Sequence, residues 1–115
     1  MRRGEVYLVN LDPTLGSEAA KQRPAVLVSN DAANRAAERY DRGVVTIVPI
    51  TSNVSRVYPF QVLLRTGEGG LNAKSKAQAE QVRSVDVSRL GRRLGTVAPA
   101  TLRQLDDALR LHLSL

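Results

Sequence analysis

Apolar and polar residues alternate along the chain in short segments separated by polar turns. Residues 5–11 alternate like a half-buried strand, which Asp12-Pro13 ends because proline has no backbone donor. Residues 23–29 open with a cation and continue as an apolar run, so they predict a strand covered on both faces. Further strands are predicted at 44–50, 60–64, 76–85 and 93–97.

Between these strands, alanine, proline and glycine mark other local structures. Residues 31–40 favour a short helix, which Asn30 or Asp31 can cap. Pro49 near the end of the third strand predicts an edge strand or a bulge. The glycine-rich residues 66–70 are followed by no helix signal, so they predict a hairpin turn rather than a phosphate-binding loop.

The last segment of the chain has the pattern of an amphipathic helix. It opens at Ala98-Pro99, and Thr101 with Gln104 has the spacing of a capping box. Asp106 and Arg110 are predicted to pair across one turn on the outer face. The inner face is expected to carry a stripe of leucines at positions 102, 105, 109 and 113.

Together these elements predict an α+β, mainly β fold: a small, partly open SH3-like antiparallel barrel with an inserted helix and a C-terminal helix. The 115 residues fit a single domain, 1–115, that is large enough to bury a core without disulfides or a structural metal ion. The sequence contains no cysteine, which excludes thiol nucleophiles and thiolate metal sites. No apolar run approaches the ~20 residues of a membrane helix, so a cytoplasmic protein is expected.

The charge of the chain favours polyanionic ligands without requiring them. Lys and Arg number 17 against 11 acidic residues, for a net charge of +6. Fourteen of the 17 bases are arginine, whose planar fork suits phosphate. Nucleic acid and an acidic protein partner are both compatible with this balance.

Candidate chemistry is confined to polar groups at strand–loop junctions. His112 is the single histidine, so paired-histidine catalysis and multi-histidine metal sites are excluded, and we expect neither metal nor cofactor. If the barrel brings the second and third strands together, Arg23 and Thr51 converge at one rim. An arginine and a hydroxyl can bind a phosphoryl oxygen and stabilise charge in a transition state. The reaction that fits them is transesterification of RNA, whose 2′-hydroxyl serves as nucleophile.

Each candidate also has a purely structural interpretation. Arg23 could be a solvated loop cation, and Thr51-Ser52 could be a strand-ending turn with local hydrogen bonds. Glu18 is by default a surface acid. Tyr58 and Phe60 could stack on bases, but with so few aromatic residues in the chain we expect them in the core. The solvent face of an ordinary strand would account for Gln78, Glu80 and Gln81.

An ordered set of motifs resembles the MazF/PemK family of toxin endoribonucleases nearly from end to end. The matching segments are Arg3-Gly4-Glu5-Val6-Tyr7, Leu11-Asp12-Pro13-Thr14, Gly16-Ser17-Glu18, Arg23-Pro24-Ala25-Val26, Ser29-Asn30-Asp31, Asn34-Arg35, Val48-Pro49-Ile50-Thr51-Ser52, Tyr58-Pro59-Phe60, Gln81-Val82-Arg83-Ser84-Val85-Asp86 and Ala108-Leu109-Arg110-Leu111-His112-Leu113. The resemblance implies a CcdB/MazF-type barrel that forms a homodimer and cleaves single-stranded RNA at short sequences without metal. It further implies 2′,3′-cyclic phosphate and 5′-hydroxyl products, inhibition of translation and growth, and a cognate antitoxin whose acidic, disordered segment occupies the RNA groove.

Carried over by position, the resemblance also implies roles for individual residues. Arg23 resembles the family's catalytic arginine, which acts as acid or as phosphate stabiliser, and Thr51 resembles its partner hydroxyl. Glu18 falls where several members carry a glutamate that shapes the RNA site or acts as base. The loop 14–22 is expected to gate the RNA groove, with Gly16 as its hinge. RNA contacts are expected from Ser17, Lys21, Gln22, Ser52, Asn53, Arg56, Lys76, Gln78, Glu80, Gln81 and Arg83.

The Kid-like branch of the family uses a different set of catalytic residues. Glu80 stands where that branch has an aspartate base, but Ser17 replaces its loop histidine and Gln78 its strand arginine. The Arg23/Thr51 version is therefore favoured, and the general base stays open. Two other hypotheses are a gyrase-poisoning module like the CcdB barrels and a nucleic-acid-binding barrel without catalysis.

Overall fold

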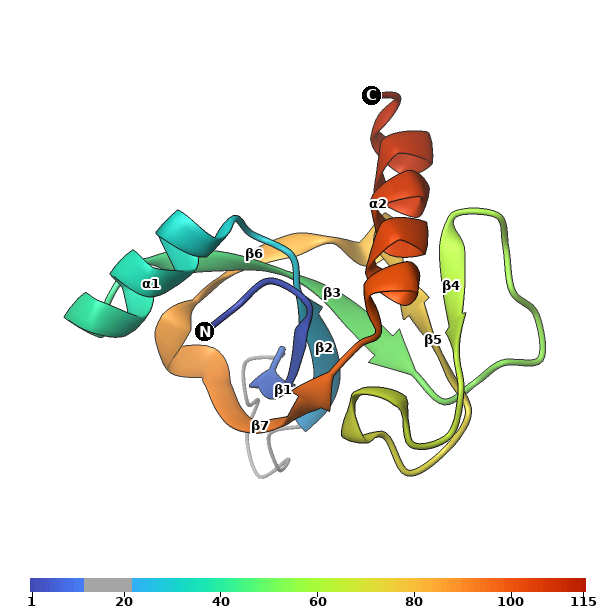
Figure 1. The fold of residues 1–115 in the computed structure, drawn as a ribbon, viewed down its shortest axis with the longest axis horizontal. Helices are drawn as coiled ribbons and strands as arrows, with labels where there is room; N and C mark the ends of the chain where they lie inside the picture. Colours follow the sequence, from blue (N-terminus) through green and yellow to red (C-terminus); the bar gives the residue numbers. More distant parts are fainter. Residues whose placement is uncertain (12–21) are drawn as a thin grey trace, which may run out of the picture.

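In the computed structural model, which describes residues 1–11 and 22–115, the chain forms an antiparallel sheet flanked by two helices (Figure 1). This confirms the predicted α+β, mainly β fold. Within the described residues the sheet has seven strands in the order β4-β5-β3-β2-β1-β7, and β6 also pairs with β3. The elements are β1 (Glu5–Asn10), β2 (Gln22–Leu27), α1 (Asp31–Tyr40), β3 (Val44–Thr51), β4 (Gln61–Leu64), η1 (Glu68–Gly70), β5 (Ser75–Gln78), η2 (Ala79–Gln81), β6 (Arg83–Asp86), η3 (Val87–Arg89), β7 (Leu90–Thr96) and α2 (Pro99–Leu113).

Strand β3 is central in the sheet, so the prediction that Pro49 marks an edge strand is wrong. On one side Pro49 is paired with Ala25 of β2. On the other side β3 pairs with β6 only as far as Ile47 and with β5 only from Ile50. Pro49 therefore lies where no ladder on that second side requires a backbone donor.

The single strand predicted over 76–85 is also wrong, because the segment is split between two strands. β5 pairs with the end of β3 and with β4, whereas β6 pairs with the beginning of β3. The turn η2 between them buries Ala79 completely. Alternation along the sequence is the same in both strands, so only the change of pairing site on β3 reveals the break.

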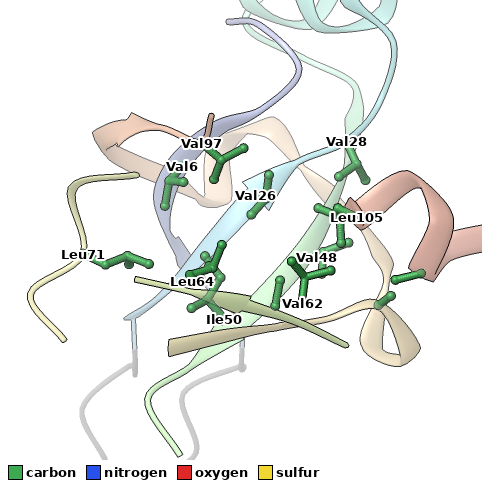
Figure 2. Close-up of a cluster of buried hydrophobic side chains, with 13 residues drawn as sticks. Val6, Val26, Val28, Val48, Ile50, Val62, Leu64, Leu71, Val97 and Leu105 are labelled. Carbon is green, nitrogen blue, oxygen red and sulfur yellow. The ribbon is translucent and has the colours of Figure 1, made fainter. Parts of the chain in front are cut away.

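Two apolar cores lie on opposite faces of β2, as its continuous apolar run predicts. Val26 belongs to the core covered by α2, and Leu27 to the core that includes Ala37 of α1. Figure 2 shows the first of these cores, in which Leu105 of α2 meets side chains from the central strands. Burial on both faces fixes β2, which carries Arg23 near its beginning.

The helix α1 is capped as predicted, whereas α2 is not. Asn30 accepts a hydrogen bond from the Ala33 backbone N–H at the start of α1. At α2 the N-cap is Ala98, without a side-chain cap, so the capping box at Thr101 is wrong. The leucine stripe is confirmed at its centre: Leu105 is buried and its neighbours pack on the same core, although Leu113 is exposed.

The predicted ion pair on α2 is replaced by two others. Asp106 Oδ1 accepts from Arg3 Nη2 at 2.5 Å, which joins α2 to the start of β1. Arg110 instead pairs with Asp107 at 3.2 Å. In the described part of the chain, neither helix is long and apolar enough to cross a membrane.

A network around Glu5 joins β1 to β7. The buried Glu5 carboxylate accepts from the Arg2 backbone N–H (2.6 Å), the Tyr7 hydroxyl (2.9 Å) and Arg93 Nη1 (2.8 Å). Burial opposes ionisation of Glu5, but these hydrogen bonds outweigh it and lower its pKa. Burial, together with the hydrogen bond to Glu5, raises the pKa of Tyr7.

Candidate functional site

A cleft of about 590 Å³ lies at one end of the sheet, where the beginning of β2 meets the end of β3. Its walls come from β1, β2, β3, β5 and β7 and from the connection between β4 and β5. The lining residues are Leu8, Arg23, Pro24, Ile50, Thr51, Ser52, Gly70, Leu71, Asn72, Ala73, Ser75, Arg92 and Leu94. The lining is mixed: apolar side chains such as Ile50 and Leu71 alternate with polar ones such as Arg23, Thr51 and Asn72.

The structure brings Arg23 and Thr51 to this one cleft, as the sequence predicts. The β2–β3 ladder ends at Ala25 paired with Pro49. Continuing that antiparallel register by two residues places Arg23 opposite Thr51, on the same face of the sheet. Pro24 restricts the residue before it to extended backbone, which aligns Arg23 with the strand.

Thr51 makes a local hydrogen bond that leaves its proton available. Its Oγ1 accepts from the Asn53 backbone N–H at 3.2 Å, and Asn53 in turn accepts from Ser55. The structural interpretation of Thr51-Ser52 as a strand-ending turn is therefore correct. A hydroxyl that accepts one hydrogen bond can still donate its own to a phosphate oxygen.

The cleft is positively charged. Arg23 and Arg92, both exposed, contribute two guanidinium groups, and no acidic residue is among the described residues that line it. Ser52 and Asn72 add neutral polar groups. Arg92 and Asn72 were not among the predicted site residues, because only the tertiary fold brings residues so distant in the chain to the cleft that Arg23 lines.

Lys76 and Arg56 lie in a second cluster, around Tyr58. Lys76 is paired with Thr51 in the β3–β5 ladder, but its ammonium donates to the Arg56 carbonyl at 2.5 Å. Tyr58 stacks on Phe60 with ring centroids 5.3 Å apart, and Arg56 Nη1 donates to its hydroxyl at 3.2 Å. Tyr58 is 41% exposed, so its expected place in the core is wrong. RNA contacts by Lys76 and Arg56 stay predictions.

Glu80 belongs to this second region and does not line the cleft. Its Oε2 accepts from Gln61 Nε2 at 2.8 Å, and Gln61 Oε1 accepts from the Tyr58 backbone N–H. Glu80 Oε1 is buried without a partner among the described residues. Gln78 pairs with Gln61 in the β4–β5 ladder, so its side chain belongs to this sheet edge too.

The other predicted RNA contacts are dispersed. Arg83 Nη1 donates to the Leu11 carbonyl at 3.0 Å, so it secures the end of β1. Gln22, Asn53 and Gln81 are exposed and lie outside the cleft lining. Ser17, Glu18, Lys21 and the Gly16 hinge lie outside the described residues. Within the described ranges, no group of three or more His, Asp or Glu side chains could hold a metal ion.

Comparison with known proteins gives one consistent result. Residues 2–113 match the family described as PemK-like, MazF-like toxin of type II toxin-antitoxin system. The whole chain is 60% identical over 115 residues to a protein named Endoribonuclease MazF9 from Mycobacterium tuberculosis, 98% of which is covered.

Solved structures agree with this match in fold. A mycobacterial endoribonuclease in complex with its cognate antitoxin superposes with a TM-score of 0.79 at 28% identity, covering 100% of this chain and 96% of that one. MazF from Deinococcus radiodurans superposes with a TM-score of 0.78 at 27% identity, covering 100% and 97%.

Proposed function

Because the chain belongs to the PemK-like, MazF-like toxin family of type II toxin–antitoxin systems, we propose that it is an endoribonuclease that cleaves single-stranded RNA in the Arg23/Thr51 cleft. The observation that carries the proposal is the convergence of these two residues from separate strands. A guanidinium and a hydroxyl donor at one rim suit the phosphoryl oxygens of a phosphodiester. The relative named MazF9 supports the same activity.

The proposed reaction is transesterification within the substrate. The 2′-hydroxyl loses its proton to a general base, its oxygen bonds to the adjacent phosphorus, and the bond to the 5′-oxygen breaks. The departing 5′-oxygen takes up a proton from water, and the base releases its own to solvent, so the products are a 2′,3′-cyclic phosphate and a 5′-hydroxyl. Arg23 stabilises the charge on the phosphoryl oxygens and Thr51 donates a hydrogen bond to one of them. Glu18 is our candidate for the base.

The biological consequence we propose is sequence-specific cleavage of mRNA in the cytoplasm, which inhibits translation and growth. A homodimer would present two such clefts, and a cognate antitoxin would neutralise them by laying an acidic, disordered segment across the RNA groove. The net charge of +6 supports both polyanionic ligands. A related mycobacterial endoribonuclease solved with its cognate antitoxin supports the antitoxin partner.

The proposal is tested by digesting a long single-stranded RNA in the presence of EDTA and mapping the new ends. We expect cleavage at a short recurring sequence, with 2′,3′-cyclic phosphate ends. A synthetic RNA with a single 2′-deoxynucleotide on the 5′ side of the mapped bond should resist cleavage, while its all-ribose control is cut. Cleavage of the 2′-deoxy substrate would contradict the 2′-hydroxyl mechanism. RNA that is bound but never cut would instead indicate a nucleic-acid-binding barrel without catalysis.

A further inference from the structure

Strand β7 has an irregularity at the point where it borders the cleft. Tyr7 of β1 is paired with Arg93 and Val9 with Leu90, so two residues of β7, Gly91 and Arg92, stand opposite Leu8 alone. This is a β-bulge, a device that re-aims side chains and is common beside active sites. A Cβ on Gly91 would lie 3.2 Å from the Leu8 carbonyl oxygen, so the absent side chain lets the strands approach closely there.

Beyond the bulge, two neighbouring arginines have different surroundings. Arg93 Nη1 lies 2.8 Å from Glu5 Oε2, within the network that joins β1 to β7. Arg92 and Arg23 both line the cleft. Arg23 belongs to β2 and Arg92 to β7, and these two strands flank β1 on its two sides. Arg92 is exposed and makes no hydrogen bond or ion pair within residues 1–11 and 22–115. Arg93 thus has a structural partner, whereas Arg92 lines the cleft without one among the described residues.

We propose that Arg92 is a second phosphate-binding residue, which holds an RNA phosphate next to the one that Arg23 engages. The inference rests on the proposed function and adds to it a substrate-binding subsite on β7. Phosphates recur along an RNA strand, so an RNA bound at Arg23 places its neighbouring phosphates along the same cleft, which Arg92 also lines. The guanidinium fork matches a phosphate with two parallel hydrogen bonds, and the cleft offers no acidic competitor among its described lining residues.

The direct test measures binding to a single-stranded, fully 2′-fluoro-substituted oligonucleotide of mixed sequence, which lacks the attacking hydroxyl. Affinity is measured over a salt series for wild type, Arg92→Ala, Arg92→Lys and Arg103→Ala. Arg103 is an exposed arginine of α2 outside the cleft, so its variant is matched for the loss of one charge. Thermal melts check that all four proteins are folded.

We expect Arg92→Ala to weaken binding about tenfold and to reduce the slope of log affinity against log salt by about 0.7, the loss of one single-strand phosphate contact. Arg92→Lys should keep the slope, and Arg103→Ala should match wild type. Equal slopes for Arg92→Ala and wild type would overturn the proposal. So would an equal loss in Arg103→Ala, because that would indicate general charge rather than a subsite.

Cleavage kinetics separate this inference from the proposed function. If wild type cuts RNA, Arg92→Ala should raise KM about tenfold with kcat within about threefold, since its contact is the same in the ground and transition states. Unchanged KM in a wild type that cuts would overturn the role of Arg92 alone. A wild type that binds without cutting would overturn the proposed function, and the salt slopes would still decide the subsite. An Arg92→Ala variant that lost affinity for an acidic antitoxin peptide but not for the oligonucleotide would also overturn the RNA subsite.

Discussion

Replacing Gly95 with alanine should push η1, whose Gly70 lines the cleft, away from β7. Gly95 lies in β7, where a Cβ would meet the Gly69 carbonyl carbon at 2.7 Å, the Gly70 nitrogen at 2.8 Å and the Gly69 oxygen at 2.9 Å. All three atoms belong to backbone, so no side-chain rotation can relieve the contact. Gly95 is not among the residues with positive φ, so the effect is crowding alone.

The size of the effect follows from these contacts. Overpacking costs about 1–3 kcal/mol, and a contact with three backbone atoms belongs at the upper end. Alanine also stabilises the protein by about 0.4–1 kcal/mol, because it restricts the unfolded chain, so the free energy of unfolding should fall by about 2 kcal/mol in total. The unfolding entropy of 115 residues is about 0.24 kcal/mol/K, so Tm should fall by about 8 °C.

Scanning calorimetry with a matched glycine separates crowding from backbone strain. Gly43 has φ +111° and no heavy atom within 4 Å of an added Cβ, so Gly43→Ala carries only the cost of its backbone conformation. Because Gly70 and Leu71 line the cleft, Gly95→Ala should also impair RNA cleavage, whereas Gly43→Ala should not. A Gly95→Ala protein with wild-type Tm and activity would refute the close approach of η1 to β7.

Two further predictions concern the core and the β1–β7 network. The Leu105 side chain of α2 is 1% exposed, so Leu105→Ala should lower the free energy of unfolding, measured by urea titration, by about 2–5 kcal/mol. The control Leu115→Ala, at an 84% exposed position, should change it little. A loss below about 1 kcal/mol for Leu105→Ala would contradict the packing of this side chain. Glu5→Gln should lower stability by about 1–2 kcal/mol at pH 7, because it weakens the hydrogen bonds to the carboxylate. The pKa of Glu5 in the folded protein lies below its ordinary value, so this stabilisation is complete above about pH 4.3 and is lost as pH falls through the lowered pKa. The free energies of unfolding of wild type and Glu5→Gln should therefore converge in acid. A difference between them that is constant from pH 7 to about pH 3 would contradict the network.

Features set by a few neighbouring residues could be predicted from the sequence. The apolar run of β2 requires burial on both faces wherever it lies, and the Asn30 cap needs only the backbone three residues on. The convergence of Arg23 and Thr51 required one long-range assumption, that β2 pairs with β3, and the structure satisfies it.

Features set by strand pairing could not be predicted. β5 and β6 read as one strand because both alternate with period two, and only their separate sites on β3 divide them. Arg92 reaches the cleft through a bulge that exists only when β7 is paired with β1. The α2 cap was misplaced because Thr101 and Gln104 satisfy a local pattern that the helix start at Pro99 makes unnecessary.

The most direct test of the Arg23/Thr51 cleft is the single-turnover rate of RNA cleavage by wild type, Arg23→Ala and Arg103→Ala in EDTA. A contact that stabilises transition-state charge is typically worth about 3 kcal/mol, so Arg23→Ala should cut about 100-fold more slowly. Arg103→Ala loses the same charge outside the cleft and should cut at the wild-type rate. A folded Arg23→Ala protein that cuts within about threefold of wild type would contradict the assignment of this cleft as the active site.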